Sequence, residues 1–503
     1  MHDAARYFFL NTLKPFKMKR NIFPIIALCM FGFSLHVLAQ NEDDALRYSR
    51  QQYGGTARTI ALGGSFGALG ADFSSLSTNP AGIGLYRKSE ITFSPQIFYR
   101  NANTNYLGSG ADDSRYAFNF QNLGLVFNGQ TRHAKKDTKG WKSFSFGIGM
   151  NRIADFNNRT LTSGTNGSGS FLDSFTAGAQ GKETEQFDRF TTQMAYQTYL
   201  INPLNDSLNP NRYFSEMPAG INKLQTRNTA TTGGINETAI SFGGNYNNFL
   251  FWGATIGIAR IRYNHTSNYE ERDIEDTVAI DNFVYAEDVA TRGSGTNLKA
   301  GIIVMPLDWI RIGASFHTPT FYQLSESFDY SMTSSFDNGT NYSFADNGSF
   351  DYNLRTPFRA MGSLAFIIGK LGLITGDVEF VDYREASLRA VRYSFLDENA
   401  AIESKYTAAT NFRAGTEWKL DRFSVRGGYS YFGSPFSNTS WESATQTFSL
   451  GAGYREEGFF LDVAYYQSAM SRKVFLYNGD FNPNLVSEKL SWGGVVATLG
   501  FKF

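Results

Sequence analysis

Hydrophobic and polar residues alternate along much of the chain after residue 89. The segment FSFGIGMN at 144–151 is one example, and IRIGASFH at 310–317 is another. Successive side chains of a β-strand point to opposite faces, so a period of two predicts strands with one apolar and one polar face. Fourteen segments show this pattern, at about 90–100, 115–128, 142–154, 237–247, 249–263, 295–305, 308–320, 356–367, 371–384, 405–418, 422–433, 445–455, 458–470 and 488–503.

The predicted strands are long, and their connections alternate between two lengths. Strands of soluble proteins average about 5–6 residues, whereas a tilted strand that crosses a bilayer needs about 9–11. We expect long loops at 101–114, 155–236, 264–294, 321–355, 385–404, 434–444 and 471–487, and short turns between the other strands, with 129–141 as a longer exception. An even number of strands with short turns at one end and long loops at the other is typical of an outer-membrane β-barrel.

The last predicted strand alternates up to a C-terminal aromatic residue, Phe503. Such an ending is typical of barrels that the barrel-assembly machinery recognises, although a soluble strand can also end this way. Unpaired strand edges leave backbone groups unsatisfied in lipid, so a membrane-spanning sheet has to close. Arg260 occupies a position that the alternation assigns to the apolar face of its strand. It therefore either lies at the outer rim of the barrel or marks a bulge in the strand.

Composition agrees with a barrel and excludes two classes of protein. The 503 residues include 46 basic and 46 acidic ones, 42% are hydrophobic, and the mean hydropathy is −0.30. Bundles of transmembrane helices need many apolar runs of about 20 residues, so that class is excluded. The absence of a basic excess argues against nucleic-acid binding.

The N-terminus has the pattern of an export signal. Lys19 and Arg20 precede an apolar stretch at 22–38, and a small residue, Ala39, ends it, so we expect cleavage before Gln40. Residues 1–17 are interpreted as an over-called start, and a membrane anchor is the alternative for the apolar stretch. Removal of residues 1–39 takes five basic and one acidic residue, which leaves 41 and 45. It also removes Cys29, the single cysteine, so the mature chain has no disulfide or thiolate metal site.

Residues 40–88 do not alternate and are rich in Gly, Ala and Ser. The lumen of a fourteen-stranded barrel is too wide to be filled by strand side chains alone. We therefore expect residues 40–88 to form a plug, here called the hatch, inside a barrel of residues 89–503.

The hatch contains a motif of glycines, an arginine and a turn. Its residues are Gly55, Arg58, Gly63, Gly64, Asn79, Pro80, Ala81 and Gly82. In this order, after a signal peptide and before alternating strands, they resemble the FadL/TodX family of outer-membrane transporters for hydrophobic compounds. The motif covers about thirty residues, and the fourteen-strand layout extends the resemblance, less specifically, over the mature chain.

The resemblance implies a monomeric barrel that captures long-chain fatty acids or aromatic hydrocarbons at its outer loops. It further implies a lumenal pocket and passive lateral exit into the membrane beside a kinked strand. By the same resemblance, Asn79, Pro80 and Ala81 belong to the part of the hatch near that kink. Gly147 and Gly149 in the third strand would permit the kink, or they are ordinary barrel glycines.

Two groups of residues are candidate ligand contacts. In the 155–236 loop, Phe187, Phe190 and Met194 are spaced as one apolar face of a helix within 183–200. They either form a capture groove or pack on neighbouring loops to close the barrel mouth.

There are three further candidates, because strand parity predicts that the side chains of Arg311, Arg413 and Arg426 face the lumen. An arginine pairs well with a fatty-acid carboxylate. However, Asp377, Glu379, Glu417 and Asp462 point inward as well, so a ladder of ion pairs that braces the hatch is the alternative.

Catalysis has little support in the sequence. The mature histidines, His133, His265 and His317, have no metal-ligand spacing, and there is no Gly-x-Ser-x-Gly motif. We expect a transporter of hydrophobic compounds that is not an enzyme and needs no metal or cofactor. The alternatives are an aromatic or haem-like cargo, and a structural or adhesive barrel with a sealed lumen.

Overall fold

The computed structural model describes residues 42–52, 54–136, 138–204, 211–477 and 479–503. The chain divides into two units, Met1–Val37 and Leu38–Phe503, and only the second contains described residues. The predicted signal peptide at 1–39 lies outside them. Among the described residues, no helix is long and apolar enough to cross a membrane.

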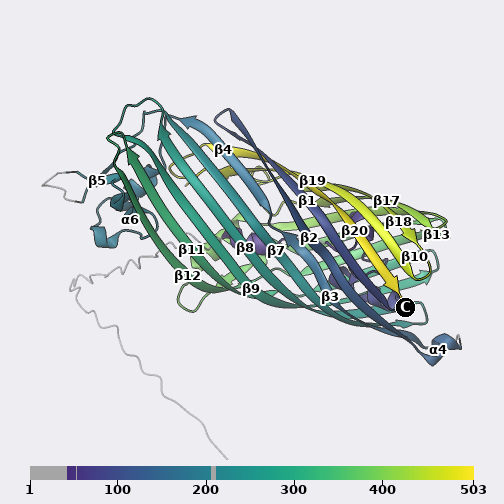
Figure 1. The fold of residues 1–503 in the computed structure, drawn as a ribbon. Helices are drawn as coiled ribbons and strands as arrows, with labels where there is room; N and C mark the ends of the chain where they lie inside the picture. The colour runs from purple at the N-terminus through teal and green to yellow at the C-terminus, as the bar shows by residue number, and fades with distance from the viewer. Residues whose placement is uncertain (1–41, 53, 137, 205–210, 478) are drawn as a thin grey trace, which may run out of the picture. The chain divides into compact units, whose positions relative to one another are not determined.

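The helices are short, and most of the strands are long (Figure 1). The helices are α1 (Glu42–Ser49), α2 (Ala57–Ala61), α3 (Ser75–Thr78), η1 (Pro80–Leu85), α4 (Arg132–Lys135), α5 (Leu172–Ala179), η2 (Thr184–Gln186), α6 (Thr192–Gln197), η3 (Tyr383–Glu385) and α7 (Leu396–Lys405). The strands are β1 (Glu90–Tyr106), β2 (Ser109–Gln130), β3 (Trp141–Asp155), β4 (Asn158–Asn166), β5 (Ile201–Pro203), β6 (Tyr213–Ser215), β7 (Lys223–Tyr246), β8 (Leu250–Asp273), β9 (Ile280–Leu307), β10 (Ile310–His317), β11 (Phe321–Phe336), β12 (Asn341–Arg355), β13 (Arg359–Ile368), β14 (Gly372–Asp382), β15 (Ser387–Arg389), β16 (Ala408–Leu420), β17 (Phe423–Phe432), β18 (Thr445–Arg455), β19 (Phe459–Phe475) and β20 (Leu485–Lys502).

The strands form a closed antiparallel barrel of fourteen wall strands, as predicted. Closure is made by β1, which pairs with β2 on one side and with β20 on the other. Several wall strands consist of two pieces. β10 and β11 both pair with β9, and they are separated by Thr318, Pro319 and Thr320. Pro357 separates β12 from β13 in the same way, because proline lacks the N–H that a ladder requires.

The outer face of the barrel carries an apolar band. On β2 the exposed side chains are Tyr116, Phe118, Phe120, Leu123 and Phe127. The corresponding inward positions of the wall carry buried charges, such as Glu237, Lys299 and Asp377. This arrangement is the reverse of a soluble protein and matches a wall that faces lipid outside and a polar lumen inside.

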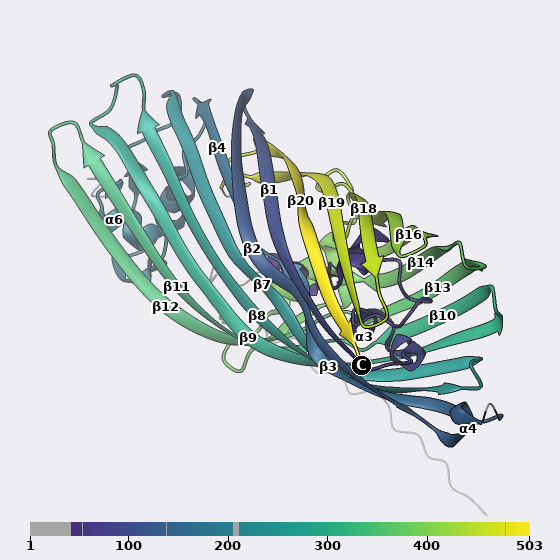
Figure 2. The ribbon, with the colours of Figure 1, turned by 45° about the vertical axis from the view of Figure 1, so that its right-hand side comes forward.

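Beyond the apolar band, the sense of the alternation inverts. On β11, Tyr322, Leu324 and Phe328 are buried inside, whereas Gln323 and Ser325 are exposed. The expectation of loops at 264–294 and 321–355 is therefore wrong, because most of these residues extend strands β8, β9, β11 and β12. Figure 2 shows that β7, β8, β9, β11 and β12 extend far past β13, β14 and β16 to β18 at the end opposite the C-terminus.

Arg260 lies at the start of this polar part of β8 and is exposed. The β7–β8 ladder runs past it, in register with Asn236, without a shift. Arg260 is therefore a residue of the outer rim, and the alternative of a bulge is excluded.

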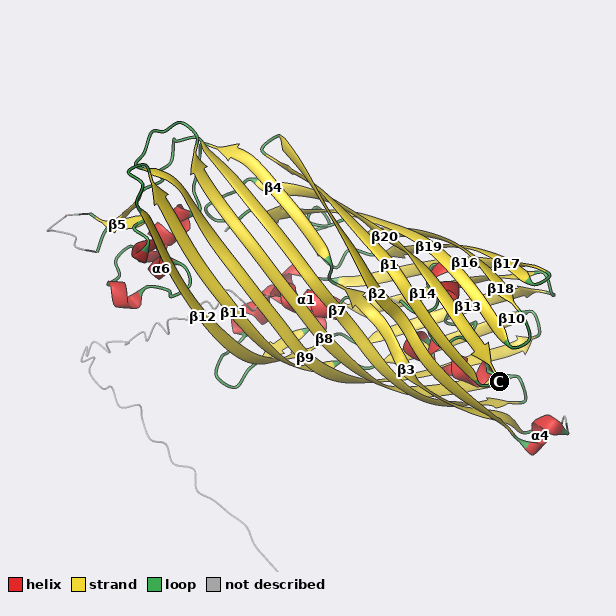
Figure 3. Ribbon diagram, in the orientation of Figure 1, coloured by secondary structure: helices red, strands yellow, loops and turns green. Residues whose placement is uncertain are grey.

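The hatch helices α1, α2, α3 and η1 lie among the strands, inside the barrel (Figure 3). Residues from α2 contact β17 to β20, and η1 contacts β3, β7, β8 and β9. Apolar clusters join the hatch to the wall, for example around Leu62 and Phe66, around Phe73 and Leu76, and around Ala57 and Ala61. The hatch thus contacts the wall on several sides of the lumen.

Candidate ligand pathway through the barrel

The predicted hatch motif makes the tight contacts that hold the plug. Asn79 caps η1 by accepting the N–H of Ala81 at 3.1 Å, and Pro80 occupies the first turn. The Asn79 amide also donates to the carbonyl oxygens of Gly67 and Ile302, at 2.6 and 3.3 Å. This part of the hatch therefore lies against the inner face of β9, and it contacts β8 as well.

Glycines allow the hatch backbone to approach the wall and itself closely. Gly63 and Gly64 adopt φ of 65° and 76°, the left-handed region that favours glycine. A Cβ on Gly63 would lie 2.8 Å from the backbone nitrogen of Tyr429. Gly55 has φ of 128°, and a Cβ on Gly82 would lie 2.6 Å from Ser75. Larger residues at these positions would separate the hatch from the wall.

One buried ion pair and several hydrogen bonds to buried carboxylates hold the hatch to the wall. Arg58 of α2 donates to both carboxylate oxygens of Glu417, at 2.7 and 3.1 Å. Asp377 accepts the backbone N–H groups of Phe66 and Gly67, at 2.9 and 3.1 Å. The hatch residue Ser77 donates to Glu237 at 2.8 Å.

The three predicted lumenal arginines all have protein partners. Arg426 pairs with Glu417 and Asp462, at 2.7 and 2.6 Å. Arg413 pairs with Glu379 at 2.6 Å, and Arg311 donates to the carbonyl oxygen of Leu69 at 2.9 Å. Arg413 and Arg426 thus pair with acids of the wall, and Arg311 bonds to the hatch. Both readings of these arginines, ligand contacts and a bracing ladder, stay predictions.

The two glycines of the third strand contact the hatch. Gly147 and Gly149 pair in register with β2, and a Cβ on them would lie 2.9 Å from Leu76 and 2.5 Å from Phe73. The two register shifts of β3 against β7 fall between Trp141 and Ser143 and between Arg152 and Ala154. The register shifts of the third strand therefore do not coincide with Gly147 or Gly149, the glycines predicted to permit a kink.

The barrel wall has a break at this irregularity. The β2–β3 ladder ends at the pair Asn122 and Asn151, although β2 continues outward and β4 continues the line of β3. β4 pairs with β7 and shares no ladder with β2. It lies instead against the inner side of the β1–β2 hairpin, where Thr104 donates to the carbonyl oxygen of Leu161 at 2.7 Å. The wall overlaps here without backbone hydrogen bonds between the overlapping strands.

Side chains and a hatch segment occupy the break. Asn119 of β2 donates to Asp155 of β3 at 2.9 Å, across the break. The backbone N–H of Gln52 in the hatch donates to the carbonyl oxygen of Ile153 at 2.8 Å. A Cβ on Gly54 would lie 2.1 Å from Gln121 and 2.5 Å from the carbonyl oxygen of Arg152. The described hatch residues Gln51, Gln52 and Gly54 are here called the strap, and Gln52 and Gly54 pack on the two sides of the break.

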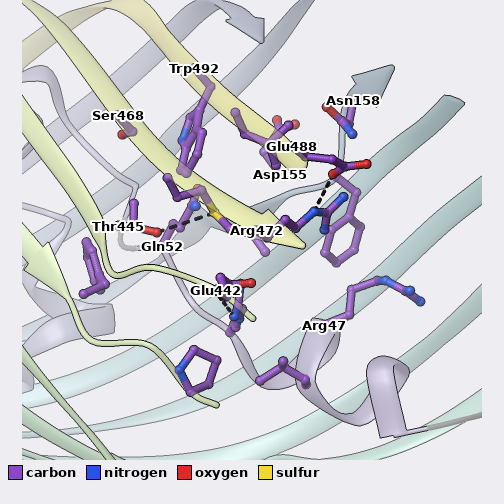
Figure 4. Close-up of a pocket in the computed structure, with 18 of the residues that line it drawn as sticks. Arg47, Gln52, Asp155, Asn158, Glu442, Thr445, Ser468, Arg472, Glu488 and Trp492 are labelled. Carbon is purple, nitrogen blue, oxygen red and sulfur yellow. Dashed lines mark hydrogen bonds and ion pairs between the residues drawn. The ribbon is translucent and has the colours of Figure 1, made fainter. Parts of the chain in front are cut away.

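A cavity of about 960 Å3 extends from the break into the lumen. Its lining includes Gln121 of β2 and Ala154, Asp155 and Asn158 from the far side of the break. Figure 4 shows how ion pairs such as Arg472 with Glu488 border the cavity near Trp492. Arg50 of the hatch pairs with Glu442 in the same cavity. The lining combines these charges with apolar groups such as Leu490, Val486 and Met470.

Arg100 differs from the other arginines of the cavity. Its guanidinium carbon lies 4.9 Å from the ring centroid of Trp492, and its buried Nε has no hydrogen-bond partner. Among the described residues, no carboxylate lies within ion-pair distance of it. The directly opposite residue on β2 is Arg115, whose Nε is buried without a partner as well. Arg100 thus has no ion-pair partner among the described residues, although the carboxylate of Asp155 acts on it through space.

The predicted apolar face of the long loop is turned inward. Met194 is fully buried, and Phe187 packs on Tyr196 and Tyr213 at 5.6 and 5.2 Å. Phe190 packs on Phe328 and Tyr330 of β11, at 5.2 and 5.3 Å. A helix that spans these residues is wrong, because η2 and α6 leave 187–191 outside any helix. The loop closes over neighbouring strands, which was the alternative to an exposed groove.

Residues 167–204 and 211–222 therefore form a lid inside the extended strands. Glu271 of β8 accepts the hydroxyl of Ser170 at 2.5 Å and the N–H of Phe171 at 2.7 Å. The Phe171 ring packs on Tyr269 and Tyr477, at 5.0 and 5.2 Å. Residues 205–210 between the two parts of the lid lie outside the described residues.

Sequence reasoning missed Arg100, Trp492 and the strap. The signal for Arg100 was present, because it shares inward parity with Phe98 and Ala102. The strap has no periodic pattern, so only the fold brings it to the break. Of the histidines, His317 is buried and within 2.7 Å of the carbonyl oxygen of Thr78, and His133 is exposed on a turn.

No family model matches the sequence, and no curated protein matches it. Solved structures do match. A FadL homologue from Pseudomonas aeruginosa is similar with a TM-score of 0.56 and 13% identity, over 90% of this chain and 99% of that one. The toluene transporter TodX from P. putida is similar with a TM-score of 0.53, 13% identity and the same coverage. The chain therefore has the barrel fold of the FadL and TodX transporters, as its hatch motif suggested.

Proposed function

We propose that the protein is an outer-membrane transporter for passive uptake of hydrophobic molecules with an anionic end, such as long-chain fatty acids. The cargo enters past the lid, occupies the lumenal cavity and leaves sideways through the wall between β2 and β3. The observation that carries the proposal is the break in the β2–β3 ladder, because the cavity is lined by residues from both of its sides.

The physics of the membrane favours an exit at this break. Along the rest of the membrane-facing wall, the described neighbouring strands are joined by backbone ladders, with a short interruption between β1 and β20 at Ser94 and Pro95. Such ladders are costly to open in lipid. At the break, the contacts are side-chain hydrogen bonds and the strap. Movement of Gln52 and Gly54 away from β2 and β3 would uncover a passage without rupture of a ladder. A structural or adhesive barrel with a sealed lumen needs no such break.

Arg100 favours an anionic cargo over a neutral aromatic one. A buried guanidinium without an ion-pair partner is costly, and a carboxylate ligand would satisfy it through charge-assisted hydrogen bonds. The ring of Trp492 beside it, and the apolar groups of the lining, would contact the alkyl chain. A neutral molecule such as toluene would leave Arg100 without an ion-pair partner.

Uptake of labelled oleate by cells with and without the protein tests this function. We expect faster uptake by cells that carry the protein. In liposomes that contain the protein, we expect transfer across the bilayer without any energy source. Equal uptake in both would contradict the fatty-acid function. Faster uptake of labelled toluene with unchanged oleate uptake would instead assign an aromatic cargo. The similar structure TodX is described as a toluene transporter, so we also propose that this protein is not an enzyme.

A further inference from the structure

The turn between β2 and β3 differs from the other turns at its end of the barrel. It contains residues 131–140, whereas the turns β7–β8, β9–β10, β13–β14, β16–β17 and β18–β19 contain two or three residues each. Figures 1 and 3 show α4 of this turn projecting past the strand ends, near the C-terminus. Short turns lie on the periplasmic side of outer-membrane barrels, so this projection faces the periplasm.

The projection is basic and exposed. Arg132, Lys135, Lys136 and Lys139 are all exposed, and among the described residues no carboxylate pairs with them. Asp137 is the one acid in the 131–140 sequence and lies outside the described residues. The turn therefore carries a formal excess of positive charge. We call the described residues 131–136 and 138–140 the basic turn.

Hydrogen bonds hold the basic turn in a defined shape. Thr131 caps α4 by accepting the N–H of Ala134, and Nδ1 of His133 lies 2.9 Å from the hydroxyl oxygen of Thr138. At its base, the N–H of Gly140 donates to the side chain of Asn247 at 2.6 Å, and the N–H of Asn247 donates back to Gly140. The cations are therefore displayed from a structured turn that is tied to the next hairpin.

The aromatic side chains next to the turn place it relative to the membrane. Trp141 is exposed on the outer face, and its ring lies 5.2 Å from Tyr246 and 5.3 Å from Phe144. Trp252 joins the same cluster at 6.4 Å. Tryptophan and tyrosine on the outer face of a barrel lie at the level of the lipid headgroups. Residues 132–139 follow directly on the periplasmic side of that level.

We propose that the basic turn binds the phosphate groups of anionic phospholipids in the periplasmic leaflet. Two observations carry this inference independently of the proposed transport function. The first is the group of exposed cations without described acidic partners, and the second is their continuity with an aromatic cluster at headgroup level. Lysine and arginine near an anionic membrane surface are attracted to it, and their donors match phosphate oxygens.

Native mass spectrometry of the mature protein in detergent tests the proposal. The protein is incubated with equimolar phosphatidylglycerol and phosphatidylcholine, and the bound lipids are counted. We expect preferential retention of phosphatidylglycerol that decreases as salt is added. The variant Lys135→Gln/Lys136→Gln is expected to weaken that preference roughly tenfold, since an anionic surface attracts each such cation with about 1 kcal/mol.

A matched variant removes two exposed cations from the long-loop end, Arg389→Gln/Arg392→Gln. It is expected to retain the preference of the unmodified protein. Heat-modifiable migration on gels shows whether each variant is a folded barrel. Equal retention of both lipids by the unmodified protein would overturn the proposal. An unchanged preference in the folded Lys135→Gln/Lys136→Gln variant would also overturn it, because the lipid would then bind elsewhere.

Discussion

Asn119 donates a hydrogen bond of 2.9 Å to Asp155 across the place where β2 and β3 no longer share a ladder. At this place a hydrogen bond between two side chains joins β2 and β3, whereas backbone hydrogen bonds join them along their ladder. The strap lies directly behind them, with Gln52 bonded to Ile153. This arrangement makes the β2–β3 junction the weakest part of the wall.

The first prediction concerns the cation of the cavity. Arg100→Gln should lower oleate affinity about tenfold or more, because hydrogen bonds to charged groups contribute roughly 1.5–3 kcal/mol. Toluene binding should not change, since a neutral ring does not use the charge. Fluorescent fatty-acid displacement measures the affinity, and Arg392→Gln, on an exposed loop, is the control. An unchanged oleate affinity in Arg100→Gln would mean that the carboxylate is bound elsewhere.

The second prediction concerns the attachment of the hatch. Arg58→Met leaves Glu417 with one partner fewer, and breaking a buried ion pair costs about 3–5 kcal/mol. We expect the hatch to loosen, with more frequent channel openings in planar-bilayer recordings. Arg384→Met is the matched control, because the pair of Arg384 with Asp382 is largely exposed and contributes little. Identical conductance in both variants would contradict the role of this ion pair.

The third prediction concerns pH and the first helix of the hatch. Burial raises the pKa of Asp44 in α1 from 3.8 to about 7, although the nearby Arg47 opposes the shift. The docked helix therefore favours the protonated carboxyl, and its docking weakens as the pH rises from about 4 to about 7. Hydrogen exchange of residues 42–50, corrected for intrinsic rates, should show less protection at pH 8 than at pH 5.5.

Asp44→Asn is the control for this pH dependence. Asparagine is close to a protonated aspartate in shape and does not titrate, so the difference in protection between the two pH values should shrink. An equal difference in the Asp44→Asn variant would show that another group controls the docking of α1.

The sequence determines the membrane-spanning part of the fold because lipid imposes a simple rule on each strand. Residues such as Phe146 and Ile148 have to face outward, and the alternation that results is visible without a structure. The extended parts of β8 to β12 obey the opposite rule, with Tyr322 and Leu324 inside, so a search for lipid-facing parity misses them. The same alternation with its sense reversed would have identified them.

The candidate site was less accessible to sequence reasoning. The hatch motif predicted a plug, but the contacts of Arg311, Arg413 and Arg426 depend on which acid lies opposite each of them in the closed barrel. The sequence predicted an irregular third strand at Gly149, whereas the break begins near Arg152. Its position depends on where the hatch contacts β3. The ion pairs of Arg413 and Arg426 join residues 9 to 36 positions apart, and the contact of Arg311 with Leu69 spans 242 positions. Each depends on how strands and hatch are placed in the closed barrel, which no local pattern encodes.

The central claim is that cargo leaves through the break between β2 and β3, and a reversible cross-link tests it. The mature chain has no cysteine, so Asn119→Cys/Asp155→Cys introduces two thiols that a short bis-methanethiosulfonate reagent can join across the break. Thr447→Cys/Ser468→Cys is the control, because these residues face each other across the intact β18–β19 ladder, with their hydroxyl oxygens 2.7 Å apart.

The measurement is the rate of oleate uptake by cells that carry each cross-linked variant, before and after reduction. The account predicts that the link across the break abolishes uptake, that reduction restores it, and that the control link has no effect. Full uptake with the Asn119–Asp155 positions completely cross-linked would contradict the account, because the cargo would then leave by another route.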